Sequence, residues 1–317
     1  MLQTVVSVSL PIQEHLTIRR QRLSPVTDNL AKTNELPRLC IVTGTHGDEL
    51  EGQYVCYALQ QRIAAAPEAL TGIVDIYPAL NPLGMNAICR DMPMFDLDMD
   101  RVFPGNADGP VAEYIASELM KDLRGASCVV DLHGSNIFLR ETPQVRLSVP
   151  NAGQLLPLAR LLNTDFIWVS SNAAALESTL AYSLCAIGIP ALVVEMGIGL
   201  RLTPAYGEQL TDGLLALMAR LGIWSGKVPP IRRPVESADG EVALLNAEAP
   251  GMFIPAVPHG AQLLRGQCVG EVVDVLRGQP VQRVIAPADG WLFTLREYPA
   301  CCAGSLVARM MLGGDIL

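Results

Sequence analysis

Short apolar runs alternate with longer amphipathic stretches through the first two thirds of the chain. The apolar runs predict buried strands over residues 38–44, 72–78, 127–132 and 190–195. The amphipathic stretches predict helices over residues 50–65, 112–123, 155–162, 178–187 and 209–221. Because strands that are apolar throughout are buried on both faces, this pattern indicates an α/β fold with a mostly parallel sheet flanked by helices.

The pattern changes after Trp224, where residues 225–240 carry three closely spaced prolines and then a turn. From there to the end the chain shows short β-type runs broken by glycine and proline, without a convincing helix. We therefore expect two domains, an α/β catalytic domain over residues 1–228 and a β-rich domain over residues 229–317.

Two segments of the β-rich part are loosely alike. The segments that start at Ala249 and Ala286 both begin with Ala-Pro, pass a glycine and return through a Gly-rich turn to a valine-rich strand. They resemble the two halves of a small barrel-sandwich domain of the biotinyl/lipoyl type. Such domains can carry a cofactor on a lysine, but Lys227 is the last lysine of the chain, which excludes a swinging-arm carrier role.

Composition narrows the classes of partner. Half of the 317 residues are hydrophobic and only 17% are charged, which is typical of a compact globular protein. The net charge of -9 and the lack of a basic run argue against nucleic acid as a partner. No window reaches the roughly 20 apolar residues of a membrane span, and the amino terminus does not resemble a signal peptide.

The eight cysteines contain no C-x-x-C pair, so we expect buried thiols in a reducing compartment and a cytoplasmic protein. The expected partner is a small molecule, with neither nucleic acid nor membrane, and a homo-oligomer is left open.

The candidate chemistry begins with the motif Gly-Thr-His-Gly-Asp-Glu at residues 44–49, directly after a predicted strand and opening a helix. His46 and Glu49 are three residues apart and can meet on one face of a first helical turn. His133 follows another predicted strand, and ligands in an α/β sheet collect at the carboxyl ends of its strands. Two imidazoles and a carboxylate are normal Zn²⁺ ligands that leave a fourth position for water, so we expect one Zn²⁺ per chain. The alternative for a lone histidine is a structural side chain with a hydrogen-bond partner.

Three further charged residues have a functional and a structural interpretation. Glu195 ends a third predicted strand, where it could be the general base or a buried glutamate paired with an arginine. Arg90 and Arg101 lie between the first two ligand motifs and could polarise a carbonyl or hold a substrate carboxylate. The alternative for these arginines is a loop held together by Arg–Asp pairs.

The ordered motifs resemble the succinylglutamate desuccinylase/aspartoacylase family, relatives of the zinc carboxypeptidases. The matching blocks are GTHGDE, Asn81-Pro82 followed by Arg90, DMDRVFPG at 98–105, DLHG at 131–134 and VVEMG at 193–197. The resemblance implies a mixed, mostly parallel carboxypeptidase-like sheet with a metal site. Its implied residue roles are zinc ligation by His46, Glu49 and His133, catalysis by Glu195 and Arg90, and substrate binding by Arg101, Asn81 and Asp100.

Two positions depart from the family pattern. Asp100 stands where the family usually has asparagine before the second arginine, and a carboxylate accepts hydrogen bonds instead of donating them. Residues 179–188, upstream of Glu195, lack the arginine with which aspartoacylase binds the aspartate side chain. The candidates to replace that arginine are Arg140, Arg146 and Arg201.

The predicted function is hydrolysis of a small N-acyl amino acid, or a related linear amide, by zinc-activated water with Glu195 as general base. The β-rich domain is expected to cap the mouth of the site. The alternatives are a metallocarboxypeptidase that acts on peptides and a non-catalytic zinc-containing protein that binds a metabolite.

Overall fold

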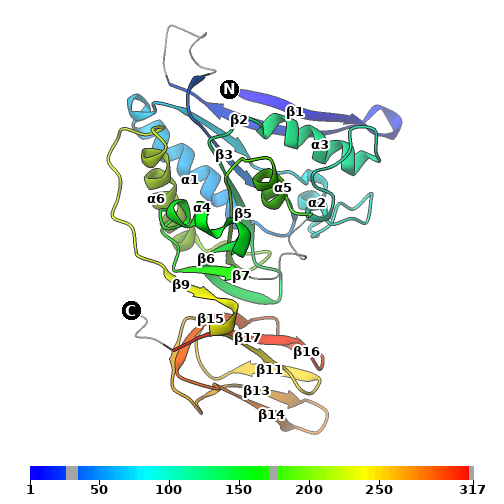
Figure 1. The fold of residues 1–317 in the computed structure, drawn as a ribbon. Coiled ribbons are helices and arrows are strands. Elements are labelled where there is room, and N and C mark those ends of the chain that lie inside the picture. Colours follow the sequence, from blue (N-terminus) through cyan, green and yellow to red (C-terminus); the bar gives the residue numbers. More distant parts are fainter. Residues whose placement is uncertain (26–34, 171–177, 314–317) are drawn as a thin grey trace.

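A computed structural model describes residues 1–25, 35–170 and 178–313 of the chain. Its main feature is a 13-stranded mixed sheet that contains the order β1-β2-β4-β3-β5-β8-β6-β15-β17-β10 (Figure 1). The strands of its first part are β1 (Leu2–Ser9), β2 (His15–Leu23), β3 (Arg38–Thr43), β4 (Ile73–Tyr77), β5 (Cys128–Gly134), β6 (Leu139–Ser148), β7 (Phe166–Ser170), β8 (Ala191–Gly197) and β9 (Val235–Ala238). The remaining strands of this sheet are β10 (Val242–Asn246), β12 (Gln262–Leu263), β15 (Gly290–Arg296) and β17 (Leu306–Leu312).

The centre of the sheet is parallel. Strands β4, β3, β5 and β8 pair in parallel, whereas β2 and β6 pair antiparallel at the two sides of this centre. These four central strands are the ones that the apolar runs predicted, and each is largely buried along its length. The predicted mixed α/β sheet is confirmed.

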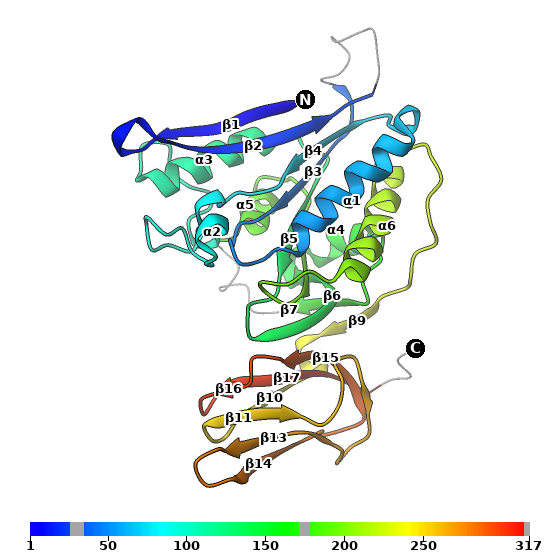
Figure 2. The ribbon, with the colours of Figure 1, turned by 180° about the vertical axis from the view of Figure 1, so that it is seen from behind.

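Helices cover both faces of the sheet (Figures 1 and 2). On one face lie α1 (Glu51–Ala65), α4 (Val149–Ala159) and α6 (Pro204–Arg220), and on the other α2 (Pro82–Ala87), α3 (Val111–Leu123) and α5 (Leu180–Ala186). The apolar run of strand β3 is continuous because both faces of the strand are covered by helices. Leu39 and Ile41 enter the core under the first set of helices, whereas Cys40 and Val42 enter the core under the second set.

Two helices begin earlier than predicted, and each has a proline in its first turn. The helix predicted over 155–162 spans Val149–Ala159, and the one predicted over 209–221 begins at Pro204. Proline fits the first turn of a helix because the amide hydrogen that it lacks would have no helical partner there. The helix predicted over 178–187 is shorter, because the Thr179 side chain caps its first turn by accepting a hydrogen bond from the Tyr182 amide.

The carboxyl-terminal part is β-rich, as predicted, and is joined to the main sheet. A second sheet contains β14 (Gln279–Ile285), β13 (Cys268–Asp274), β11 (Gly251–Pro255) and β16 (Ala300–Cys301), in that order. Strand β15 pairs with β6, and β9 pairs with β7, so hydrogen bonds run from the α/β part into the β-rich part. The domain boundary at residue 228 stays a prediction.

Two further observations bear on the sequence-based expectations. The eight cysteines, which all lie in the described part of the chain, are free thiols. Within residues 1–25, 35–170 and 178–313, no helix is long and apolar enough to cross a membrane.

Candidate active site

The loop between β3 and α1 carries the first two predicted metal ligands and is held in a tight turn by glycine. Gly44 adopts a left-handed φ of 68°. A Cβ atom on Gly47 would lie 2.0 Å from the carbonyl carbon of Gly84 in α2, so no larger residue fits there without moving backbone. The glycines of the motif therefore allow the loop to pack closely against α2 while it positions His46.

His46, Glu49 and His133 converge although 84 residues separate the last two. The two carboxylate oxygens of Glu49 lie 2.8 Å from His46 Nδ1 and 3.0 Å from His133 Nδ1. The two Nδ1 atoms are 3.3 Å apart. Zn–N bonds of about 2.0–2.1 Å place the donor atoms of a tetrahedral site about 3.3 Å apart, so these three side chains fit a zinc ion.

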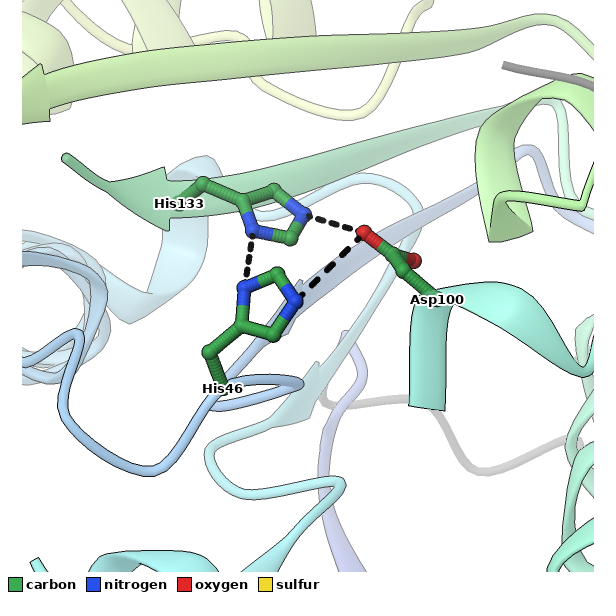
Figure 3. Close-up of side chains that lie close together, drawn as sticks. All are labelled: His46, Asp100 and His133. Carbon is green, nitrogen blue, oxygen red and sulfur yellow. Dashed lines mark hydrogen bonds and ion pairs between the residues drawn. The ribbon is translucent and has the colours of Figure 1, made fainter. Parts of the chain in front are cut away.

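Aspartates lie on the other edge of both imidazoles. His46 Nε2 is 3.1 Å from Asp98 Oδ1, and His133 Nε2 is 3.4 Å from Asp131 Oδ2. Figure 3 shows Asp100 facing both rings, with Oδ2 at 3.9 Å from His46 Nε2 and 3.7 Å from His133 Nε2. A carboxylate behind a histidine fixes which ring nitrogen carries the proton, and so leaves the other nitrogen free to bind a metal.

His46, Asp100 and His133 also form a group whose ligand atoms all lie within 4.8 Å of one another. Asp100 is therefore an alternative third ligand to Glu49. The shorter contacts of Glu49 and its position on the Nδ1 side of both rings favour the predicted set. In that arrangement Asp100 is left on the Nε2 side, as an orienting carboxylate.

The charges in this cluster shift the pKa values of its side chains. Burial would lower the pKa of His46, but hydrogen bonds to Asp98 and Glu49 outweigh it and raise that pKa to about 9. Burial would raise the pKa of Glu49, but the positive charge of His133 and the hydrogen bonds to both histidines lower it to about 2. The site thus holds Glu49 as a carboxylate and attracts positive charge.

Glu195 lies beside the predicted metal ligand His133. It is the register partner of His133 across β5 and β8, and both side chains line the same cavity of about 540 Å³. Its Oε1 accepts a hydrogen bond from Arg146 Nη1 at 3.1 Å, which is the arginine pairing considered as the alternative. Burial raises the pKa of Glu195 above its ordinary value, although Arg146 opposes the shift. A carboxylate of raised pKa in a cavity is suited to proton transfer.

The two predicted arginines lie at the cavity and contact acidic residues. Arg90 donates hydrogen bonds to Glu49 Oε1 at 3.1 Å and to Asp98 Oδ2 at 3.3 Å. Arg101 Nε is 3.9 Å from the same Asp98 oxygen, and half of the Arg101 side chain is exposed. The structure thus contains the Arg–Asp pairs of the structural interpretation within a cavity that both arginines line.

Asn81 and Asp100 differ in their access to the cavity. Asn81 is fully buried, accepts a hydrogen bond from the Gly84 amide and donates one to the Arg90 carbonyl at 3.3 Å, which fixes the backbone of that arginine. Asp100 lines the cavity, and its Oδ1 is buried without a hydrogen-bond partner among the described residues. Substrate binding by these two residues stays a prediction.

Of the three candidate replacement arginines, only Arg146 lines the cavity. Arg140 pairs with Glu297 and donates to Thr203 Oγ1, and exposed Arg201 donates to the carbonyl of Leu200. Among the charged residues that line the cavity, Glu141 on β6 and Arg309 on β17 were not singled out by the sequence analysis and lie outside its motifs. Their signal was weak, because each is a single charged residue outside any recognisable motif.

A family model for the succinylglutamate desuccinylase/aspartoacylase catalytic domain matches residues 35–221, more than half of the chain. This span includes His46, Glu49, His133 and Glu195. The chain belongs to this family. Membership of the succinylglutamate desuccinylase/aspartoacylase family supports an amide-hydrolysing enzyme.

Individual proteins are similar to this chain over nearly its whole length. The chain is 28% identical over 304 residues to the N-alpha-acetyl-L-2,4-diaminobutyric acid deacetylase of Halomonas elongata, covering 92% of this chain and 86% of that protein. The product-bound structure of the ectoine utilization protein EutE (DoeB) from Ruegeria pomeroyi superposes with a TM-score of 0.82 at 20% identity, over 98% of this chain and 95% of that one. A family member from Rhodobacter sphaeroides gives 0.80 at 21% identity, over 99% and 96%. These two structural matches establish the shared fold.

Proposed function

We propose that the protein is a zinc-dependent deacylase that hydrolyses the amide bond of a small N-acyl amino acid. The observation that carries the proposal is the convergence of His46, Glu49 and His133 at zinc-ligand spacing in the same cavity as Glu195. One Zn²⁺ per chain would be held by these three side chains. When bound, zinc would polarise the scissile carbonyl and lower the pKa of an attacking water.

The residues around the ligands divide the remaining work. Glu195 accepts a proton from the attacking water at its carboxylate and delivers it to the leaving nitrogen. Arg90, whose guanidinium donates to the ligand carboxylate of Glu49, stabilises the oxyanion of the tetrahedral intermediate. Asp98 and Asp131 orient the two imidazoles from behind.

The substrate class follows from the relatives and from the size of the cavity. The similar enzyme of Halomonas elongata is named for deacetylation of N-alpha-acetyl-L-2,4-diaminobutyric acid. A volume of about 540 Å³ suits a small molecule of that kind. We therefore propose an N-acetylated amino acid with a short side chain as the substrate class.

The test combines metal analysis with a substrate panel. Purified protein should contain about one zinc per chain. In a panel of N-acetyl amino acids, N-succinyl amino acids and short peptides, it should release the amine from the N-acetyl amino acids but not from the peptides. Glu195→Gln should retain zinc and lose about 10²–10⁴-fold in kcat. Cleavage of peptide carboxyl ends would instead identify a carboxypeptidase, and zinc without turnover of any amide would indicate a binding protein.

A further inference from the structure

The cavity has a second charged cluster, on the side of the β-rich part. Glu141 on β6 is buried, and its carboxylate accepts hydrogen bonds from two guanidinium groups. Arg146 Nη2 donates to its Oε2 at 2.5 Å, and Arg309 Nη1 donates to its Oε1 at 2.5 Å. Arg309 belongs to β17, so the β-rich part of the chain supplies a residue to the cavity.

The positions of both guanidinium groups are fixed by packing as well as by charge. The Trp168 ring lies 5.8 Å from the Arg146 guanidinium carbon and 5.6 Å from that of Arg309. The two side chains are only 28% and 18% exposed. An arginine pair held in this way loses little side-chain entropy when it binds an anion.

Glu141 is not available to a substrate. Its Oε1 accepts from Arg309, and its Oε2 accepts from both Arg146 and the side chain of Gln144 at 2.5 Å. The carboxylate therefore acts as a counter-ion within the cluster. A ligand that binds this cluster therefore contacts the arginines, which favours an anion.

The charge balance of the cluster depends on Glu195. Arg146 and Arg309 carry two positive charges, and Glu141 and Glu195 carry two negative ones. Glu195 is paired with Arg146 Nη1, yet the proposed reaction requires its carboxylate to exchange a proton with water and with the leaving nitrogen. When Glu195 gives up this pairing, the other three residues keep a net charge of +1 at a partly buried position.

We propose that Arg146 and Arg309 form the subsite for the carboxylate of the amino acid that is released, with Arg309 as a specificity-determining residue from the β-rich part. This inference rests on the proposed deacylase function. When Glu195 leaves its ion pair with Arg146, a substrate carboxylate can take its place. Substrate binding and the release of Glu195 from Arg146 therefore favour each other. A substrate with no anionic group does not provide this balance.

The test compares the best N-acyl amino acid of the panel with its carboxamide, in which the carboxylate is replaced by a neutral group of the same shape. In Arg309→Gln the value of kcat/KM for the acid should fall about 10- to 100-fold, mainly through KM, as expected for the loss of a charged hydrogen bond. The value for the amide should change less than about threefold. Arg309→Lys, which preserves the counter-charge of Glu141, should give an intermediate fall and guards against misfolding of the glutamine variant.

Two further arginine variants provide matched controls. Arg140→Gln removes another arginine of β6 that contacts the β-rich part, through Glu297, and should leave the preference for acid over amide unchanged. Arg101→Gln tests the arginine that the family pattern assigns to a substrate carboxylate. If Arg101→Gln abolishes the preference and Arg309→Gln retains it, the assignment to Arg309 is overturned. The same conclusion follows if Arg309→Gln slows acid and amide equally, or slows neither.

A binding measurement separates the two proposals. Calorimetric titration with the acid and with the amide does not depend on turnover. A wild-type preference for the acid that Arg309→Gln loses, without hydrolysis of any substrate, would support the subsite and reject the deacylase function. Turnover by a wild type that binds acid and amide equally would reject the subsite and retain the function.

Discussion

Asp100 is the residue near His46 and His133 at which this chain departs most clearly from the family pattern. Its Oδ2 faces the Nε2 atoms of His46 and His133, and its Oδ1 is buried without a hydrogen-bond partner among the described residues. A buried carboxylate in this position could orient the rings or bind a metal itself. Glu49 lies closer to both rings and on their other edge, which favours the orienting role for Asp100.

Metal content distinguishes the two carboxylates. We expect Glu49→Gln to lose most of the bound zinc, because an amide is a much weaker zinc ligand than a carboxylate. We expect Asp100→Asn, which restores the residue of the family pattern, to retain about one zinc per chain and to lose at most 10- to 100-fold in affinity, as is usual for a residue behind a ligand. Elemental analysis after dialysis against a mild chelator measures both. Zinc loss in Asp100→Asn with retention in Glu49→Gln would assign the third ligand to Asp100.

At the residue scale, the sequence predicted the side chains that follow apolar strands and missed those that do not. His46, His133 and Glu195 stand at the ends of buried strands, and the order of the parallel strands brings them together. Arg309 is 163 positions from Arg146 along the chain, and no local pattern indicates that β17 reaches the cavity. Only the pairing of the strands shows this.

At the element scale, strand β6 shows why part of the cavity wall was not foreseen. Val145 and Leu147 enter the core, whereas Gln144 and Arg146 alternate with them and interact with Glu141. A strand with one polar face inside a cavity lacks the continuous apolar run from which β3 and β5 were predicted. The hairpin of β1 and β2 was missed because its first strand lies at the edge of the sheet and has a single buried residue, Val6.

Asp75 on β4 forms ion pairs with arginines on the neighbouring strands β2 and β3. Its buried carboxylate accepts hydrogen bonds from Arg22 on β2 at 2.6 and 2.8 Å and from Arg38 on β3 at 2.7 Å, and Arg20 lies 3.4 Å away. Burial would raise the pKa of Asp75, but the Arg22 hydrogen bonds and the charges of Arg38 and Arg20 outweigh it and lower that pKa. The ionised form of Asp75 is therefore stabilised in the folded chain.

We expect Asp75→Asn to lower the free energy of unfolding at pH 7 by about 3–5 kcal/mol, because it removes the fully buried carboxylate that pairs with three partly buried arginines. A lowered folded-state pKa adds stability above the unfolded pKa of about 3.9, and that stability disappears as the pH falls through the folded value. The difference between wild type and variant should thus be full at pH 7 and smaller at pH 3. Urea unfolding at both pH values measures it, and a difference that grows on acidification would contradict this account.

At the scale of the whole molecule, the β-rich part and the α/β part share a sheet and an aromatic contact. Strand β15 pairs with β6, and Phe293 of β15 is fully buried with its ring centroid 4.7 Å from that of Phe166 on β7. Trp291 and Met311 complete this small core. The β-rich part is expected to cap the site. It also supports the cavity wall, because its strand β15 pairs with β6, the strand that carries Glu141 and Arg146.

This continuity predicts that the chain unfolds in one calorimetric transition. Phe293→Ala, at the junction, should cost about 3–5 kcal/mol and lower the midpoint of that transition without splitting it. Phe253→Ala is the matched control, because Phe253 is equally buried but lies in the separate core of the β-rich part. If the two parts unfold as one, both variants shift the same single transition. If the parts are independent, Phe253→Ala shifts only one of two transitions, and the shared sheet would then contribute too little free energy to couple the β-rich part to the cavity.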